Sequence, residues 1–373
     1  MLRHALTGRI VKFVKAPRIL FAILDAFPYD GVSPSLTPVL WSLATEGGCA
    51  NQGGRSVLSA STYPNHASFI TGVGPERHGL FTSRAPVEGE WRPAREVGLK
   101  ARTLFEDCRD AGLGAIGIFG DQNLVPICGA LEAAAHWPPQ GVLPDRCPRG
   151  PLGYGADRAV IEAFSALDFD SADLIVMQLD EIDSVRHLRG PYAPESLEQC
   201  TATDAALGEI LDCLRSRWDE TLVIVVSDHD NEAVMSGALD LHAEAQARGL
   251  DVHVEHDGTA CLVVGDVTQE TLLQLPTIEA AYPVADRHWI VWGEPGQQYG
   301  IDFGLAGQHG SPRTARQLAV VGGGHPDAQT IAAWLETHTP SGPDWAPLIR
   351  RSLGITGVSA SSAASGESSS EII

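Results

Sequence analysis

Apolar residues in this chain gather into short unbroken stretches that end close to acidic residues. Four such stretches cover residues 20–24, 113–119, 174–179 and 222–226, and they lead, directly or within two residues, into Asp25, Asp121, Asp180 and Asp228. Unbroken apolar stretches of this length are typical of strands buried on both faces, as in parallel sheets covered by helices. Ligands bind at the carboxyl ends of the strands in open α/β sheets. The pattern therefore predicts an enzyme whose site follows one edge of a sheet.

Proline-marked and periodic segments between these stretches predict the helices. The Thr37-Pro38 pair is typical of a helix that has Thr37 as its N-cap. Pro64 favours the first turn of a second helix, which places Thr62 at that helix's N-terminus. Two further segments have helical character, at residues 101–111 and 197–214. The alternation of strands and helices predicts an α/β fold with a mostly parallel central sheet flanked by helices.

The pattern changes between residues 231 and 303, where we expect a smaller α+β insertion. Strand-like stretches at residues 253–255 and 259–264 flank a His256-Asp257-Gly258 turn, which predicts a hairpin. Residues 268–281 have helical character. A second pair of strands is expected at residues 289–292 and 299–303.

The remaining boundaries follow from the same patterns. The main α/β domain covers residues 19–230, and the chain returns to it at residues 304–353, with one more strand at 318–321. Residues 1–18 form an N-terminal extension. Residues 354–373 are dominated by Ser, Ala and Gly, and we expect them to be disordered.

Charge and cysteine content narrow the choice of partners and compartment. The 373 residues carry a formal net charge of -21, which argues against a nucleic-acid polymer as partner. The seven cysteines are scattered, with no C-x-x-C spacing, and we interpret them as reduced thiols. The basic N-terminal segment lacks the long apolar core of a signal peptide, and no stretch is long enough to span a bilayer. We therefore expect a cytoplasmic protein without a membrane partner, and its oligomeric state is open.

Several acids and histidines have the spacing or the place of metal ligands. Asp183 and His187 are four residues apart, so a helical turn would direct both toward one ion, although a surface salt bridge is the commoner reading of such a pair. Asp228 and His229 directly follow a predicted strand, where the alternative is an ordinary polar strand end. His309 lies between glycines that allow close approach of the backbone, and alone it would be read as a loop histidine.

Taken together, these residues predict two mixed nitrogen and oxygen sites. Such ligands suit zinc better than calcium or magnesium. Two neighbouring metal ions could stabilise the attacking and leaving oxygens of a phosphoryl group. The set consists of three carboxylates and three histidines: Asp25, Asp183, His187, Asp228, His229 and His309.

Thr62 is the candidate nucleophile of such a site. A threonine hydroxyl reacts poorly at neutral pH, but coordination to a metal lowers its pKa. The N-terminus of a helix adds backbone N–H donors and a favourable dipole for phosphate oxygens. The alternative is that Thr62 only caps the helix.

The order of these motifs resembles one known family. They are Asp25-Ala26-Phe27, Thr37-Pro38, Thr62-Tyr63-Pro64-Asn65-His66, Thr71-Gly72, Pro75-Glu76-Arg77-His78-Gly79, Asp183-x-x-x-His187 with Gly190-Pro191, Ser227-Asp228-His229 and Gly307-x-His309-Gly310. Over roughly residues 19–321 the chain resembles the alkaline phosphatase superfamily, most closely the branch of type I phosphodiesterases and nucleotide pyrophosphatases.

The resemblance implies a hydrolase with two zinc ions, for which other divalent metals are alternatives. It implies that Asp25, Asp228 and His229 hold one ion beside Thr62, which is also a ligand. It also implies that the other ion is held by Asp183, His187 and His309. His66 and His78 are assigned structural roles. Thr62 would form a phosphothreonine, which water would then hydrolyse.

The chain departs from the family pattern at three places. Ser61 precedes the threonine where many relatives have lysine or an apolar residue, and Asp230 replaces a glycine. The asparagine that phosphodiesterase relatives use to bind phosphate is absent after Gly79. Ser83 or Arg84 could bind the phosphate instead, and the alternative for Arg84 is a solvated surface residue.

These observations favour a phosphodiesterase or pyrophosphatase that acts on a small phosphate ester, including nucleotide-like ones. The alternative is a phosphomonoesterase or phosphonate hydrolase with the same two metals and nucleophile. A non-catalytic metal-binding relative is a further alternative. A sulfatase is not expected, because the C/S-x-P-x-R context of its modified residue is missing.

Overall fold

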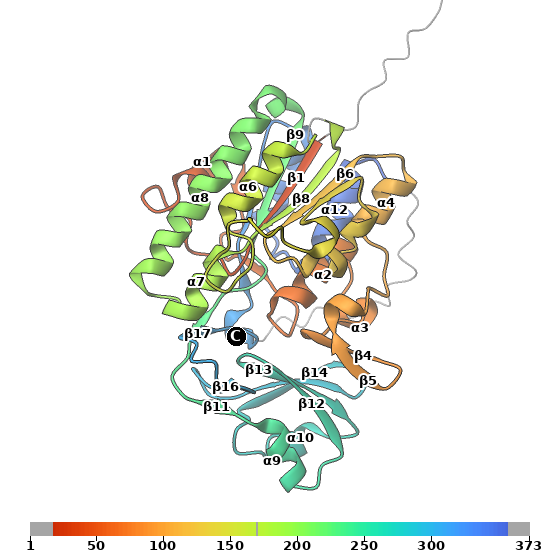
Figure 1. Ribbon diagram of the computed structural model, residues 1–373, viewed down its shortest axis with the longest axis vertical. Coiled ribbons are helices and arrows are strands. Elements are labelled where there is room, and N and C mark those ends of the chain that lie inside the picture. Colours follow the sequence, from red (N-terminus) through yellow and green to blue (C-terminus); the bar gives the residue numbers. More distant parts are fainter. Residues whose placement is uncertain (1–17, 169–170, 357–373) are drawn as a thin grey trace, which may run out of the picture.

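A seven-stranded sheet forms the centre of the computed structural model, which describes residues 18–168 and 171–356 (Figure 1). Its order is β2-β19-β9-β1-β8-β6-β7. The five strands from β9 to β7 are parallel, whereas β19 runs antiparallel to β9 and β2 antiparallel to β19. The bounds are β1 Arg18–Leu24, β2 Gly48–Cys49, β6 Ala115–Phe119, β7 Ala135–Trp137, β8 Leu174–Leu179, β9 Thr221–Val226 and β19 Ala319–Gly322. The predicted fold class is confirmed.

Helices cover both faces of this sheet, because alternate side chains of each strand point to opposite faces. On β1, Phe21 packs among residues of α2, α4, α11 and α12, whereas Leu20 packs among residues of α1, α6 and α8. Figure 1 shows these two layers on either side of the strands. The bounds are α1 Pro38–Glu46, α2 Thr62–Thr71, α4 Leu104–Asp110, α6 Asp157–Ala166, α8 Pro194–Leu214, α11 Pro326–Leu335 and α12 Trp345–Ser352. Shorter helices are α3 Pro75–His78, α5 Leu124–Ile127 and α7 Glu181–Arg189.

The N-terminus of α1 is capped by a residue from another helix. Thr37 is at the N-cap position, as predicted, but its hydroxyl donates to the carbonyl of Gly31 and caps no backbone N–H. The buried carboxylate of Asp204 on α8 accepts from the N–H groups of Val39 and Leu40, at 2.9 and 2.8 Å. α1 is therefore fixed to α8 through its free N–H groups.

The inserted segment forms a four-stranded antiparallel sheet with its own apolar core, drawn below the central sheet in Figure 1. The strands have the order β12-β13-β15-β14, and α9 and α10 cover one face. The other face contacts Phe81 and Trp91, which lie before and on the hairpin of β4 and β5. Bounds are β12 Val252–Asp257, β13 Ala260–Gly265, β14 Ala280–Ala285, β15 His288–Trp292, α9 Leu241–Ala247, α10 Gln269–Leu272, β4 Arg84–Val87 and β5 Glu90–Pro93.

Short strand pairs connect the insertion and the loops to the main domain. β10 pairs with β17, β11 with β16, and β18 with β3. Their bounds are β3 Gly54–Arg55, β10 Glu232–Ala233, β11 Ala238–Leu239, β16 Gln298–Tyr299, β17 Gly307–Gln308 and β18 Arg316–Gln317.

The hairpin predicted around residues 256–258 is present as β12 and β13, but two other predictions for the insertion are wrong. The expected helix at 268–281 ends at Leu272, because Pro276 cannot continue it, and the chain enters β14 at Ala280. Residues 299–303 do not pair with β15, whose partners are β13 and β14. The chain turns at Gly300, where φ is +94°, and the side chain of Phe303 is exposed.

Some sequence expectations concern residues outside the described part. The structure does not describe residues 1–17 of the N-terminal extension or residues 357–373 of the tail. The disorder predicted for the tail is therefore not tested. In the described part, no helix is both long and apolar enough to cross a bilayer. The seven cysteines all lie within it as free thiols.

The capping contact of Asp204 predicts a loss of stability. Replacing Asp204 by alanine leaves two buried N–H groups without an acceptor, and we expect the free energy of unfolding to fall by about 1–3 kcal/mol. Urea denaturation followed by circular dichroism measures this. Asp212→Ala, at an exposed position on the same helix, is the control and should change stability by less than about 0.5 kcal/mol. Equal effects of the two substitutions would contradict the capping role.

Candidate metal and phosphoryl-transfer site

The carboxyl ends of the central strands bring the predicted ligands to one edge of the sheet. Asp25 follows β1, Asp228 follows β9, and Asp183 lies in the first turn of α7, which follows β8. Because β19 runs in the opposite direction, the segment that precedes it, which contains His309, returns to the same edge. The topology therefore gathers residues from four separate parts of the chain.

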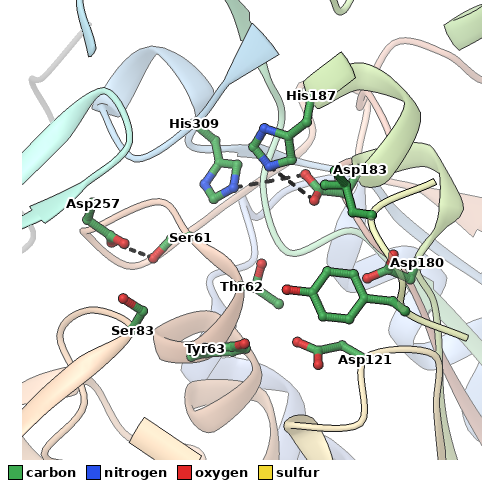
Figure 2. A pocket seen from close by; sticks show the side chains of 12 residues that line it. Ser61, Thr62, Tyr63, Ser83, Asp121, Asp180, Asp183, His187, Asp257 and His309 are labelled. Carbon is green, nitrogen blue, oxygen red and sulfur yellow. Dashed lines mark hydrogen bonds and ion pairs between the residues drawn. The ribbon is translucent and has the colours of Figure 1, made fainter. Parts of the chain in front are cut away.

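Asp183 and two histidines form one half of the cluster. On α7, the Nε2 atom of His187 is 3.2 Å from a carboxylate oxygen of Asp183, as the spacing of four residues predicts. The Nε2 atom of His309 is 3.9 Å from the other carboxylate oxygen. Figure 2 shows both rings directed toward Asp183, with Thr62 below them.

Thr62 and His229 form the other half with Asp25 and Asp228. The Nε2 atom of His229 is 3.2 Å from the hydroxyl oxygen of Thr62. It is also 3.5 Å from Asp25 Oδ1 and 3.4 Å from Asp228 Oδ2. The rings of His229 and His309 stack at 3.8 Å, so the two halves are in direct contact.

Backbone carbonyls orient the three histidines of the cluster. His187 Nδ1 lies 2.8 Å from the carbonyl oxygen of Gly307, and His229 Nδ1 lies 3.0 Å from that of Asp230. His309 Nδ1 lies 3.2 Å from the carbonyl oxygen of Ala60. A carbonyl only accepts, so each Nδ1 carries the proton and each Nε2 presents a lone pair to the cluster. Metal-binding histidines are fixed in this way by their second nitrogen.

Three carboxylate oxygens in the cluster have no hydrogen-bond donor among the described residues. They are Asp25 Oδ1, Asp183 Oδ1 and Asp228 Oδ2, all inaccessible to solvent. Orphaned buried carboxylate oxygens are costly unless a cation pairs with them. Together with the three free Nε2 atoms, they form a donor set that fits the predicted metals.

The electrostatics of the cluster agree with this reading. Burial, and then the charges of Asp228 and Asp183, raise the pKa of Asp25 well above its ordinary value. Burial raises the pKa of Asp228 to about 7 and lowers the pKa of His229 to about 3. Burial also opposes ionisation of Asp183, but His187 holds the pKa of Asp183 below its ordinary value. Asp183 in turn raises the pKa of His187, although burial opposes this. Burial lowers the pKa of His309 well below its ordinary value. The cluster therefore combines two neutral histidines, His229 and His309, with an excess of acid that a cation would compensate.

His66 lies on α2, the helix that begins at Thr62, and His78 is the last residue of α3. Ligand atoms of Asp25, His66 and Asp228 lie within 4.8 Å of one another, as do those of Asp183, His229 and His309. However, His66 Nδ1 is 2.9 Å from the carbonyl oxygen of Thr62, to which it donates, so this nitrogen has no lone pair for a metal. His78 Nε2 is 3.0 Å from the hydroxyl of Ser68. Both histidines thus have hydrogen-bond partners on α2, and the place of His229 as a ligand beside Asp25 and Asp228 stays a prediction.

A cavity of about 180 Å³ opens beside Thr62. Ser83 lines it, as expected for a residue that could bind phosphate. Arg84 does not: its guanidinium lies 3.6 Å from Glu255 and donates to the carbonyl of Trp91, because β4 directs it toward the insertion. The other lining residues are Ser61, Tyr63, Asp121, Leu152, Tyr154, Asp180, Asp183, His187, Asp257 and His309.

Asp121 and Asp180, which also follow apolar strands, have protein partners in the structure. Asp121 accepts from the N–H and the side chain of Asn123, both at 2.8 Å. Asp180 accepts from Ser184 at 2.7 Å, and from Gln178 at 3.3 Å. Gln178 also donates to Asp25 at 2.8 Å, which fixes that predicted ligand. The sequence signal for a role of Gln178 was its polar side chain within the otherwise apolar stretch 174–179.

Arg186 connects three of the segments that carry ligands, and the sequence analysis missed it. Its guanidinium donates to the carbonyl of Ala26 and to Asp230, both at 2.6 Å. Ala26 follows Asp25, and its N–H donates to Asp228 at 3.1 Å. Asp230 replaces a glycine of the family pattern, and its specific partner in this structure is Arg186.

Comparison with known proteins identifies the family of this chain. Residues 19–264 match the model of the type I phosphodiesterase / nucleotide pyrophosphatase family. The chain therefore belongs to this family, and the predicted resemblance is confirmed.

Two relatives and two solved structures illustrate the similarity. The rat ectonucleotide pyrophosphatase/phosphodiesterase family member 1 is 26% identical over 234 residues, which cover 59% of this chain and 24% of the relative. The venom phosphodiesterase of Macrovipera lebetinus is 26% identical over 240 residues, which cover 61% of this chain and 27% of the relative. The match thus spans about a quarter of the length of these proteins.

The two structures share the fold over nearly their whole length. Murine ectonucleotide pyrophosphatase/phosphodiesterase 5, an inactive threonine-to-alanine variant in complex with AMP, has a TM-score of 0.69 at 16% identity. The comparison covers 91% of this chain and 96% of that chain. Phosphonoacetate hydrolase from Sinorhizobium meliloti 1021, in complex with phosphonoacetate, has a TM-score of 0.63 at 16% identity, with the same coverage.

The contacts of Arg186 predict that it stabilises the site independently of any bound metal. Replacing Arg186 by methionine leaves Asp230 and the carbonyl of Ala26 without their donor, and we expect the free energy of unfolding to fall by roughly 2–4 kcal/mol. The metal-free protein is measured by urea denaturation. Arg189→Met, three residues further at an exposed position of α7, should have almost no effect. A loss for Arg186→Met no larger than that of the control would refute the role.

Proposed function

We propose that the protein is a metal-dependent hydrolase that cleaves a phosphodiester or pyrophosphate bond of a small substrate through a phosphothreonine on Thr62. The observation that carries this proposal is the convergence of three orphaned carboxylate oxygens and three inward Nε2 atoms beside that hydroxyl. Such a donor set suits two zinc ions, and other divalent metals are alternatives.

The ligands divide into two groups in this proposal. Asp25, Asp228 and His229 hold one ion together with Thr62. The second ion is held by Asp183, His187 and His309. Bound zinc supplies positive charge that stabilises the ionised threonine hydroxyl and the oxygens of the phosphoryl group.

The reaction follows from the position of Thr62 in the first turn of α2. Its Oγ1 forms a bond to phosphorus while the bond from phosphorus to the departing oxygen breaks, and that oxygen leaves with the electron pair. The departing oxygen takes up the proton that the threonine hydroxyl gives up. A water oxygen then bonds to phosphorus while the bond from phosphorus to Oγ1 breaks, and a water proton restores the threonine hydroxyl. The N–H groups of Thr62 and Tyr63, at the start of the helix, are available to the phosphate oxygens.

Relatives support this assignment. The family is named for phosphodiesterase and nucleotide pyrophosphatase activities. The murine structural neighbour binds AMP, and replacement of one of its threonines by alanine makes it inactive. Both facts agree with a nucleophilic threonine and a small phosphate ester.

A phosphonate hydrolase is the second candidate, because the fold also matches phosphonoacetate hydrolase. The lining of the cavity argues against it. Among the described residues that line it there is no lysine or arginine, whereas Asp121 and Asp257, whose pKa values burial raises to about 6, add negative charge at neutral pH. Repulsion disfavours substrates that carry charge beyond that of one diester phosphate. A phosphodiester, with a single negative charge, therefore fits this cavity better than a phosphomonoester or a carboxylated phosphonate.

Substitution of Thr62 tests the nucleophile. We expect Thr62→Ala to lower the hydrolysis of bis-p-nitrophenyl phosphate by about three orders of magnitude or more, because no other hydroxyl replaces it. The zinc-loaded protein is assayed with p-nitrophenol release, and zinc content is measured by mass spectrometry. Thr45→Ala, at an exposed position on α1, is the control and keeps full activity. Turnover by Thr62→Ala at the rate of the wild type would rule out the phosphothreonine route.

The charge of the cavity predicts the substrate preference. We expect kcat/KM for bis-p-nitrophenyl phosphate to exceed that for p-nitrophenyl phosphate by about tenfold or more, since the monoester is a dianion at neutral pH. Phosphonoacetate, assayed by phosphate release, should be a poorer substrate than the diester. A preference for the monoester or for phosphonoacetate would instead support the second candidate.

A further inference from the structure

Asp257 lies at the tip of the hairpin of β12 and β13, far from Thr62 in sequence but in the wall of the same cavity. Its carboxylate accepts a hydrogen bond from the hydroxyl of Ser61 at 2.7 Å, and a second one from the hydroxyl of Ser59. Figure 2 shows Asp257 directed toward Ser61, beside Thr62. A residue of the insertion thus holds the loop that carries the nucleophile.

The hairpin tip is itself fixed to the segment of a predicted metal ligand. The N–H of Thr259 donates to the carbonyl of His309 at 2.7 Å, and the hydroxyl of Thr259 accepts from the N–H of Ser311 at 3.0 Å. Gly258, with φ of +67°, allows this approach, because a Cβ there would lie 2.2 Å from the carbonyl oxygen of His309. These contacts hold the hairpin tip, and with it Asp257, against the segment that carries His309.

Ser61 has the position of an N-cap but does not act as one. Its backbone is extended, with φ of -139° and ψ of 164°, as is usual for an N-cap, yet its side chain accepts from no N–H of α2. A capping serine normally accepts from the N–H of the second or third helical residue. Here the third residue is Pro64, which has no N–H, so the group left open is the N–H of Tyr63.

We propose that Asp257 is a positioning residue for phosphoryl transfer, which draws the hydroxyl of Ser61 away from α2 and thereby keeps the N–H of Tyr63 free for a phosphate oxygen. This inference rests on the proposed role of Thr62. Asp257 does not touch the substrate in this role and acts through Ser61.

Paired substitutions test the proposal. In Asp257→Ala, the hydroxyl of Ser61 is released and caps the helix, and we expect kcat for bis-p-nitrophenyl phosphate to fall about 10- to 100-fold, as when one oxyanion donor is lost. Zinc content should stay unchanged. Adding Ser61→Ala removes the competing hydroxyl, so the double variant should recover to within about threefold of the wild type. Ser61→Ala alone should change kcat by less than about twofold.

Ser59→Ala combined with Asp257→Ala is the matched control. It removes the other serine that donates to Asp257 but leaves Ser61 free to cap, so kcat should stay as low as in Asp257→Ala. If Asp257→Ala does not fold, Asp257→Asn takes its place, because the amide keeps the volume and one acceptor oxygen. We then expect a loss of about two- to fivefold that Ser61→Ala again restores.

The outcomes separate this proposal from the proposed function. If the wild type hydrolyses the diester and Thr62→Ala does not, but the Asp257 variants keep the wild-type kcat, only the positioning role is refuted. It is also refuted if Ser61→Ala fails to restore activity, or if the Ser59 control restores it equally. If the wild type hydrolyses no phosphate ester, or Thr62→Ala is as active as the wild type, the proposed function fails and this inference fails with it.

Discussion

The structure depends on holding several carboxylates together away from water at the ends of parallel strands. Asp25, Asp183 and Asp228 repel one another and lack donors for one oxygen each. Such an arrangement is stable only if neighbouring groups fix it and a cation neutralises it. Gln178 and Arg186 provide the fixation, and the carbonyls that orient the histidines prepare the lone pairs for the cation. The cluster thus places buried acidic groups where the proposed cation would bind.

The pattern of the sequence predicted the parts that follow from local rules. Buried strands are almost entirely apolar, so their ends were visible, and Asp25, Asp228 and His229 were identified from them. The order of the motifs identified the family, which the comparison confirmed. The helix expected at residues 268–281 ends at Leu272, because Pro276 outweighs the helical character of the residues around it. Residue types and their periodicity were sufficient to predict these elements, but not to predict which distant residues their side chains contact.

Contacts between distant segments could not be predicted in this way. Arg186 neighbours a ligand, but nothing local reveals that its guanidinium reaches Ala26 and Asp230. Asp257 has the sequence context of an ordinary turn residue, and its partners precede it by nearly two hundred positions. Arg84 shows the opposite error: a cation close to the nucleophile loop in sequence is directed elsewhere by its strand. Such side chains are placed by tertiary packing, which a single sequence does not encode in its local pattern.

The antiparallel strand β19 has a consequence for the order in which the molecule assembles. It covers the outer edge of β9, a run of apolar residues, and it lies almost one hundred positions later in the chain. During synthesis on the ribosome, β9 emerges first and presents an unpaired edge, which is a template for aggregation. His309 emerges only shortly before β19, so closure of the sheet and completion of the ligand set occur together. A nascent chain therefore gains its protected edge and its complete set of candidate metal ligands in the same late step.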